Sequence, residues 1–267
     1  MVGYKTGLLT YVDILGFRDL IDESVRDPNA ITHISNILFQ FEQQFTTGGR
    51  VGVDANNMPV RLSHFHNFSD LMLRITLVDE NADLISYLNW ELLTLAHRQL
   101  MVILSDGTLI RGAVTLDKVY CEGKFVFGPA VVNGYLMEQG LAVHPRIILD
   151  DELMKKVSIG KSESRLESHY FTHGDDGIPF VDYLCGVYWD IYTGRVQSSI
   201  SPYAIVQQHR DIVLTKLNAM DNKDMKRKAK VWWMWQYHNA TISKLQIALK
   251  ENQEAIEALE KYRLISR

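Results

Sequence analysis

An apolar segment that ends in a carboxylate is the feature that most constrains how this chain folds. Residues Leu8–Ile14 are almost all apolar, several of them are β-branched, and glycines bound the segment on both sides. Such a segment is typical of a β-strand that is buried on both faces of a sheet. Because Asp13 falls at the carboxyl end of this strand, just before a turn at Gly16, the sequence predicts an acid at the end of a buried strand.

Hydrophobic periodicity predicts helices and further strands along the rest of the chain. Apolar residues at helical spacing indicate helices, and short β-branched or aromatic runs between turn signals indicate strands. The elements expected first are a helix after residue 17, a helix from Asp27 to a stop at residues 46–49, a loop over residues 51–59, two strands over residues 60–78 joined by a hairpin turn at residues 67–70, and a long amphipathic helix over residues 83–104. The elements expected next are strands over residues 108–119 and 121–127, a helix from Gly128 to about residue 141, a buried strand over residues 146–149, weaker strands near residues 168–172, 180–183 and 187–191, and two long helical segments after residue 201.

This order of elements predicts an α+β fold, in which helices flank a mixed β-sheet. If the hairpin strand lies beside the first strand, the core is a ferredoxin-like or palm-like sheet. The composition becomes helical in character after Ser201-Pro202. We therefore expect a main domain over residues 1–200 and a helical C-terminal extension over residues 201–267.

Composition excludes several classes of protein. The chain has 267 residues, 46% of them hydrophobic and 22% charged, as in ordinary globular domains. A formal net charge of -4 argues against a general nucleic-acid binder, which usually displays a basic face. Two cysteines far apart in sequence provide neither a disulfide framework nor a zinc site, and no apolar run has the roughly 20 residues that span a bilayer. We expect a cytoplasmic protein with no membrane partner.

Asp70, in the predicted hairpin turn, is the acid expected to meet Asp13. Two carboxylates at neighbouring strand ends repel each other unless a cation is present, and Mg²⁺ prefers oxygen ligands. The pair therefore indicates a divalent-metal site, which the Ile14 carbonyl could complete. The amides of residues 15–18, at a helix start, could receive phosphate oxygens. Each acid also has a simpler explanation, because Asp is common at helix caps and in turns.

Several motifs occur in a recognisable order. They are Tyr11-Val12-Asp13-Ile14-Leu15-Gly16-Phe17, Phe68-Ser69-Asp70, Arg111-Gly112-Ala113-Val114-Thr115, Phe127-Gly128-Pro129-Ala130-Val131 and the segment Ala142–Leu149. In this order and rough spacing, over about residues 5–190, the chain resembles the class III nucleotidyl cyclases. The resemblance implies two Mg²⁺ or Mn²⁺ ions per site, a nucleoside triphosphate substrate, and a homodimer with its sites at the interface.

Within that family the sequence is most similar to the bacterial Pycsar cyclases, which make cyclic UMP or cyclic CMP in antiphage defence. The forms that carry this similarity are Asp-Ile-Leu-Gly-Phe, Phe-Ser-Asp, Arg-Gly-Ala, Glu138 followed by Pro145-Arg146-Ile147, Val181-Asp182-Tyr183-Leu184, and Trp232-Trp233 with Tyr237-His238-Asn239 in the extension. The similarity implies a downstream effector with a cyclic-nucleotide-binding domain, which the product reaches.

The chain departs from the purine cyclases at four positions. Their transition-state Asn and Arg correspond to Val132 and Leu136, and their adenine-reading residues fall near His64 and Phe125. The adenylate cyclase interpretation therefore fails. Two interpretations remain, a pyrimidine cyclase with an altered pocket and a catalytically silent cyclase-fold module that binds nucleotide or a partner protein.

Other side chains have both a functional and a simpler interpretation. Arg111 is the first candidate for a phosphate contact, although an edge salt bridge explains it equally well. His64 and His66 could read the base, or be polar residues on a half-exposed strand. Phe65 or Phe125 could form a wall of the base pocket, or belong to the core. The backbone at Gly16 and Phe17 completes the predicted nucleotide-binding set.

Three further groups favour simpler interpretations. Arg146 beside a buried strand is expected to pair with a carboxylate. The basic run of residues 223–230 is expected to be a solvated helix face. The tryptophans Trp232, Trp233 and Trp235 are expected to pack the extension against the core or a second subunit.

The resemblance implies a uridylate cyclase, with a cytidylate cyclase as the alternative. Its implied mechanism is two-metal phosphoryl transfer. One cation lowers the pKa of the ribose 3′-hydroxyl and the other clamps the triphosphate, and then the 3′-oxygen attacks the α-phosphorus and pyrophosphate leaves. A palm-type polymerase or dinucleotide cyclase shares the two-carboxylate logic, but the chain has no string resembling Gly-Gly-Asp-Glu-Phe.

Overall fold

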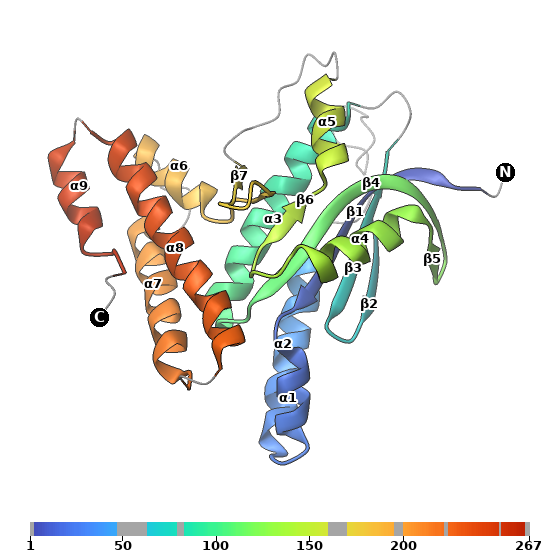
Figure 1. Cartoon of the computed structure of the whole chain (residues 1–267), viewed down its shortest axis with the longest axis horizontal. Helices are drawn as coiled ribbons and strands as arrows, with labels where there is room; N and C mark the ends of the chain where they lie inside the picture. Colours follow the sequence, from blue (N-terminus) through green and yellow to red (C-terminus); the bar gives the residue numbers. More distant parts are fainter. Residues whose placement is uncertain are drawn as a thin grey trace.

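The computed structural model describes residues 3–46, 63–78, 83–159, 170–194, 200–221, 224–250 and 252–264. The predicted loop at residues 51–59 and most of the predicted helix stop at residues 46–49 lie outside these ranges. The described residues form one β-sheet with helices on both faces and a group of helices beside it (Figure 1). The predicted α+β fold with a mixed sheet and flanking helices is therefore confirmed.

The centre of the sheet has a ferredoxin-like order. The strands β4, β1, β3 and β2 are neighbours in that order, and each adjacent pair is antiparallel. In the register of these strands, Asp13 pairs with Leu71 on one side and with Arg111 on the other. The bounds of these strands are β1 Lys5–Ile14, β2 Ser63–Phe68, β3 Leu71–Leu77 and β4 Ile110–Glu122.

Shorter strands extend the sheet beyond β4. The strand β6 pairs parallel with β4, β8 and β7 follow antiparallel, and β5 folds back on the end of β4. Their bounds are β5 Phe125–Phe127, β6 Ile147–Leu149, β7 Phe171–His173 and β8 Pro179–Val181.

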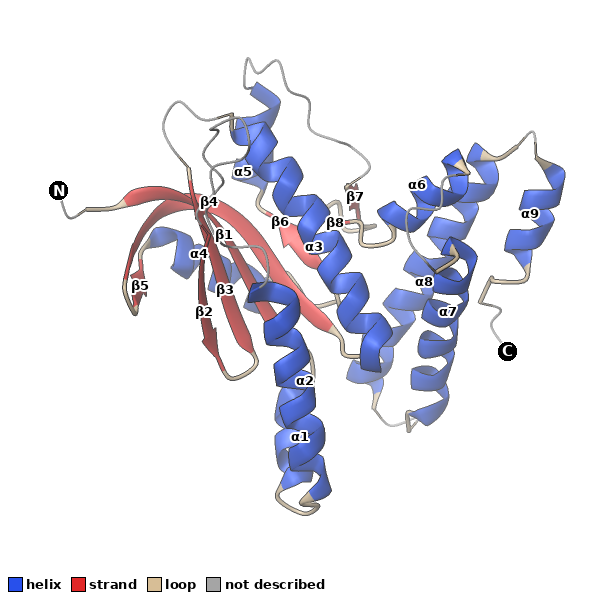
Figure 2. Cartoon of the chain, turned by 180° about the vertical axis from the view of Figure 1, so that it is seen from behind, coloured by secondary structure: helices blue, strands red, loops and turns tan. Residues whose placement is uncertain are grey.

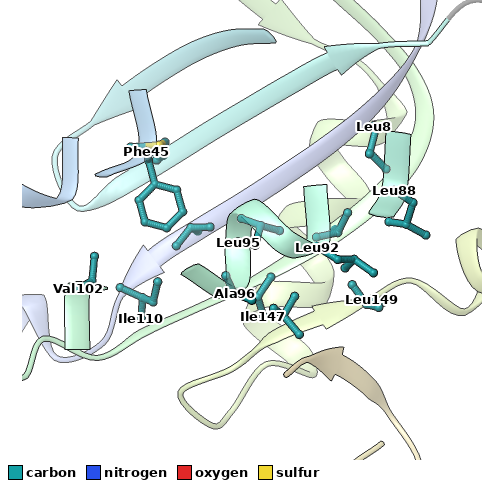
Figure 3. Packing of buried hydrophobic residues seen from close by; sticks show 14 of the residues in the cluster. Leu8, Phe45, Leu88, Leu92, Leu95, Ala96, Val102, Ile110, Ile147 and Leu149 are labelled. Carbon is teal, nitrogen blue, oxygen red and sulfur yellow. The ribbon is translucent and has the colours of Figure 1, made fainter. Parts of the chain in front are cut away.

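One face of the sheet packs on α2 (Asn29–Thr46) and α3 (Leu84–Asp106). Leu8 and Ile110 from the sheet belong to one hydrophobic cluster with Leu92 and Leu95 of α3. Figure 3 shows side chains of this cluster between the strands and the helix. Asp83 caps α3 by accepting a hydrogen bond from the amide of Ile85, as expected for an Asp at this position.

The opposite face packs on α4 (Pro129–Gly140), which begins with proline in its first turn. Leu9 and Tyr11 of β1 point to this side, because side chains alternate between the two faces of a strand. Gly134 lets α4 approach closely, since a Cβ there would lie 2.9 Å from a methyl carbon of Leu9. Figure 2 shows α4 and α3 on opposite sides of the sheet.

The C-terminal extension shares a hydrophobic core with the sheet and α3. Leu100 and Ile148 pack in one cluster with Val213 of α7 and Met234 of α8. The bounds of the remaining helices are α1 Phe17–Ser24, α5 Asp151–Ile159, α6 Cys185–Thr193, α7 Pro202–Ala219, α8 Met225–Ala248 and α9 Gln253–Glu260.

Several parts of the sequence prediction need correction. The break predicted between residues 119 and 121 falls at residues 123–124, because β4 continues to Glu122, and the extension contains α9 besides the two predicted helical segments. Residues 187–191, predicted as a weak strand, belong to α6, because Val187 and Ile191 recur at helical spacing and bury against the extension. Helix α5 was not expected. Its start is marked by Asp150, whose side chain accepts a hydrogen bond from the amide of Glu152. Among the described helices, none is both long and apolar enough to cross a membrane.

Candidate functional site

The two acids singled out from the sequence meet at the end of β1. Asp13 is the last but one residue of β1, and Asp70 lies in the turn between β2 and β3. The amide of Ile14 donates a hydrogen bond of 3.2 Å to the backbone carbonyl of Asp70, which fixes this turn beside β1. The two carboxyl groups lie close enough to hydrogen-bond to each other when one is protonated.

A third acid, Glu138, reaches the same place from α4. Its carboxylate is fully buried, and its Oε1 lies 2.5 Å from Nη2 of Arg111. The Nε of Arg111 is 3.4 Å from Oδ2 of Asp13, so the guanidinium bridges the two carboxylates. Arg111 was predicted either to contact phosphate or to form a salt bridge, and in this structure it forms the salt bridges.

Electrostatics at this cluster disfavour a full set of negative charges. Burial raises the pKa of Asp13 to about 7, with further contributions from Glu138 and Asp70, while Arg111 opposes the shift. Burial also raises the pKa of Glu138, again against the effect of Arg111. A carboxyl pair of this kind holds a proton near neutral pH unless a cation replaces that proton.

These residues fit a divalent cation through oxygen ligands. No group of three His, Cys, Asp or Glu side chains within the described ranges is arranged to hold a metal ion. Mg²⁺ is nevertheless often bound by one or two carboxylates together with water and substrate phosphates. The carboxylates of Asp13 and Asp70, with a backbone carbonyl such as that of Ile14, therefore suit a metal that binds together with a phosphate-bearing ligand.

The turn after β1 leads directly into α1. Gly16 has a φ of 83° at the N-cap of α1, in the left-handed region that favours glycine. The amide of Leu15, predicted to be available for phosphate, instead donates a hydrogen bond of 2.8 Å to the carbonyl of Leu109. The amides of Phe17 and Arg18 lie at the helix start, where no intrahelical acceptor exists. The Phe17 ring is buried in the core, so only its backbone can contact a ligand.

The residues predicted to surround the base do not form one group. His64 and His66 are half-buried on one face of β2, and Nε2 of His66 lies 3.7 Å from Sγ of Cys121. Phe65 points to the other face, where it packs on the core and lies 5.8 Å from the Arg74 guanidinium carbon. It therefore does not share a face with the two histidines. Phe125 is exposed in β5, at the opposite end of β4 from Arg111.

Two simpler interpretations from the sequence agree with the structure. Arg146 is buried and pairs with Asp176, and its guanidinium lies over the rings of Phe180 and Trp233. Trp233 of α8 also contacts Phe180 of β8 edge-on, with 5.4 Å between ring centroids, so it packs the extension against the sheet. Trp232 and Trp235 stack on each other at 4.6 Å.

Lys226 and Arg227 of the basic run over residues 223–230 are exposed, as predicted for a solvated helix face, and Arg227 also lines a cavity together with the half-buried Lys230. This cavity, of about 310 Å³, lies between α1, α2, the α3–β4 turn and the helices α7 and α8. Ile14 and Gly16 line it on one side, and Arg227 and Lys230 line it on the other. Sequence spacing could not reveal this placement, because it depends on how α8 docks against α1.

Glu138 is the site residue that lacked an assigned role from the sequence. The sequence does place Glu138 four and eight residues after Gly134 and Ala130, on the helix face that packs against the sheet, and this spacing could have identified it. A carboxylate in that position requires a cation or a proton nearby.

Comparisons with known proteins find similarity among solved structures. No protein-family model and no curated protein matches the chain. Among solved structures, the chain is similar to the adenylyl cyclase CyaB from P. aeruginosa, with 14% sequence identity and a TM-score of 0.39. The match covers 67% of this chain and 94% of that one. At these values the similarity says nothing about substrate, partners or site residues.

Proposed function

We propose that this protein is a metal-dependent nucleotidyl cyclase that converts a pyrimidine nucleoside triphosphate, with UTP favoured, to its 3′,5′-cyclic monophosphate and pyrophosphate. The observation that carries the proposal is the meeting of Asp13 and Asp70 at the end of a buried strand, beside the start of α1. Acids so placed need a cation, and a helix start next to them suits phosphate groups.

Asp13, Asp70 and the Ile14 carbonyl are the groups that would hold Mg²⁺ or Mn²⁺. When bound, such cations lower the pKa of the ribose 3′-hydroxyl and neutralise charge on the triphosphate. The chain itself fixes the geometry, because β1 is paired on both sides and the Asp70 turn is hydrogen-bonded to Ile14. Rigid placement of this kind is the main protein contribution to phosphoryl transfer.

Arg111 is the cation proposed to stabilise negative charge on the phosphates. Glu138 holds its Nη2 from the buried side, so the guanidinium stays beside Asp13. A guanidinium fixed in this way can donate to a developing oxyanion without reorganisation.

A homodimer would supply what one chain lacks around the acids. His64, His66 and Phe125, the proposed base-recognition residues, do not surround Asp13 within the described part of the chain. Helix α4 also exposes apolar side chains, with Val132 56% and Leu136 58% exposed. A second copy packed on α4 would bury these side chains and could bring its own base-recognition residues to the acids. By the same resemblance, we propose an antiphage role in the cytoplasm, with an effector that binds the cyclic product.

The test is product identification. Purified protein is incubated with each of the four ribonucleoside triphosphates and Mn²⁺, and the products are identified by mass spectrometry. We expect cyclic UMP from UTP, and a loss of roughly a hundredfold or more in Asp13→Ala and Asp70→Ala. If CTP is the only triphosphate that yields a cyclic product, the substrate is CTP and the protein is a cytidylate cyclase. Wild-type-like product from either variant would contradict the assignment.

A catalytically silent cyclase-fold module is the second candidate. It is favoured by Arg111, which already has two carboxylate partners, and by apolar Val132 and Leu136 at the positions of the transition-state Asn and Arg. In the same assay this candidate predicts no cyclic product from any of the four triphosphates, and a separate calorimetric titration would still detect nucleotide binding.

A further inference from the structure

The Arg111 guanidinium is shared unequally between the two carboxylates that it bridges. Its Nη2 lies 2.5 Å from Oε1 of Glu138, while its Nε and Nη2 each lie 3.4 Å from Oδ2 of Asp13. Hydrogen bonds between charged nitrogen and oxygen atoms are usually about 2.7–2.9 Å long, so both contacts with Asp13 are weak ones. Glu138 is therefore the main partner of the guanidinium in this structure.

Burial makes the ion pair between Arg111 and Glu138 hard to separate. The Glu138 side chain is 1% exposed, while the side chains of Arg111 and Asp13 are 18% and 21% exposed. The other oxygen of Glu138, Oε2, accepts a hydrogen bond of 2.9 Å from Gln139, and among the described residues no second cation pairs with Glu138. Removing the only cation from a buried carboxylate is strongly destabilising. Asp13 is more exposed, so it can exchange the guanidinium for another cation.

The strand register would by itself favour a close pair between Arg111 and Asp13. These two residues are directly opposite each other on the antiparallel strands β4 and β1. Opposite charges in such positions attract each other and form cross-strand pairs. Glu138 reaches the guanidinium from α4, which packs on the face of the sheet that carries both side chains. Its shorter contact keeps the guanidinium beyond the usual hydrogen-bond length from Asp13.

The pair between Glu138 and Arg111 also decides which acids remain for a metal ion. One carboxylate and one guanidinium cancel, so Asp13 and Asp70 carry the charge that is left when all three acids are ionised. That remaining charge matches the charge of one divalent cation. If the guanidinium moved onto Asp13, it would cancel one of these charges and occupy an oxygen that a metal ion needs. Arg111 and a divalent cation therefore compete for Asp13.

We propose that Glu138 is a positioning residue, which raises the affinity of Asp13 and Asp70 for a divalent cation by holding Arg111 off Asp13. Glu138 is not itself a metal ligand in this arrangement, because it acts through Arg111. The inference rests on the proposed function for the assignment of Asp13 and Asp70 as metal ligands. It gives α4 a part in metal binding as well as in packing against the sheet.

The test measures binding of Mn²⁺ alone, without nucleotide, to the full-length chain by electron paramagnetic resonance. We expect Glu138→Gln to raise the Kd for Mn²⁺ about tenfold, because the released guanidinium moves onto Asp13. The double variant Arg111→Met with Glu138→Gln should bind Mn²⁺ as tightly as the wild type, because no guanidinium is left to compete. Glu138→Asp keeps the charge but shortens the side chain by one methylene group, so it should weaken Mn²⁺ binding several-fold.

Asp117→Asn is the matched control. Asp117 lies farther along β4, where its Oδ2 accepts a hydrogen bond of 3.0 Å from Asn133 of α4. The variant therefore removes an acid from the same pair of elements away from Arg111, and it should keep the wild-type Kd. Thermal unfolding of each variant checks that the fold is intact. If Glu138→Gln does not fold, Glu138→Asp and the double variant still carry the test.

The outcomes separate this inference from the proposed function. Mn²⁺ binding that weakens in Glu138→Gln and recovers in the double variant supports the inference even if no triphosphate yields a cyclic product. A wild type that binds no Mn²⁺, or an equal Kd in Glu138→Gln, would overturn the inference even if UTP yields cyclic UMP. A double variant as weak as Glu138→Gln would make Glu138 a metal ligand, and wild-type affinity in Glu138→Asp would show that its charge alone matters. Either result would also overturn the positioning role.

Discussion

At the scale of single residues, the site is a set of charges that do not balance without a ligand. Asp13, Asp70 and Glu138 converge, and Arg111 is the cation that lies between two of them. Evolution of a stable fold alone would favour fewer buried carboxylates, because burying charge is costly. A cluster of buried carboxylates with raised pKa values is typical of functional sites.

The cost of burying the charge of Asp13 beside other carboxylates predicts that the folded chain becomes more stable when this charge is removed. The pKa of Asp13 is raised from 3.8 to about 7 in the folded chain, so the unfolded state loses its proton first as the pH rises. Stability is therefore lost between about pH 4 and pH 7. In chelator at pH 8, Asp13→Asn should be more stable than the wild type by ~1 kcal/mol of unfolding free energy, after allowance for the partial exposure of Asp13. The variant should therefore unfold at a higher temperature. A lower melting temperature for Asp13→Asn would contradict the interpretation.

At the scale of elements, the extension is joined to the sheet by a buried polar network as well as by apolar packing. His209 of α7 and His238 of α8 stack, with 3.0 Å between their Nδ1 atoms. The Tyr183 hydroxyl lies 3.0 Å from Nε2 of His209, and the other ring nitrogen of His238 lies 2.9 Å from the Tyr262 carbonyl. Burial lowers the pKa of both histidines, which favours their neutral forms in the folded chain.

This network predicts that acid destabilises the protein through the extension. Below about pH 6.5 the unfolded histidines gain protons that the buried ones, with their lowered pKa, bind less readily, so stability present above this pH is lost as the pH falls. Each such histidine contributes at most ~1.4 kcal/mol per pH unit. Urea unfolding at pH 7 and pH 5 should therefore show a smaller pH dependence for His209→Gln than for the wild type. The exposed His97→Gln variant is the control and should keep the wild-type slope.

At the scale of the whole molecule, the open side of α4 is the feature that suggests a second copy. Val132, Tyr135 and Leu136 are exposed there, and Phe125 and Phe127 are exposed on β5 nearby in sequence. An exposed apolar patch of this kind is typical of a protein interface.

We expect the chain to form a dimer through α4. A charged side chain introduced on the exposed face of this helix should weaken that dimer. Leu136→Asp should weaken dimerisation about tenfold or more, because the acid would be buried without a partner. Analytical ultracentrifugation of the wild type and the variant measures this change. Ile247→Asp, at an exposed position of α8, is the control and should leave the association unchanged. A wild type that stays monomeric at high concentration, with or without nucleotide, would contradict the dimer.

The sequence predicted what depends on local patterns and missed what depends on packing between distant elements. The apolar run before Asp13 and the turn at Asp70 are local signals, so both acids were placed at strand ends in advance. Glu138 reaches the site from α4, and no local pattern encodes how that helix docks on the sheet. Phe65 was a missed signal, because strand alternation already places it on the opposite face from His64 and His66.

The most direct test of the central claim is a measurement of Mn²⁺ binding by electron paramagnetic resonance, in the presence of a non-cyclisable UTP analogue. If Asp13 and Asp70 hold the same cations, the wild type should bind Mn²⁺ and both Asp13→Asn and Asp70→Asn should lose this binding at the same metal concentration. Wild-type affinity for Mn²⁺ in either variant would show that the two acids do not form one metal site.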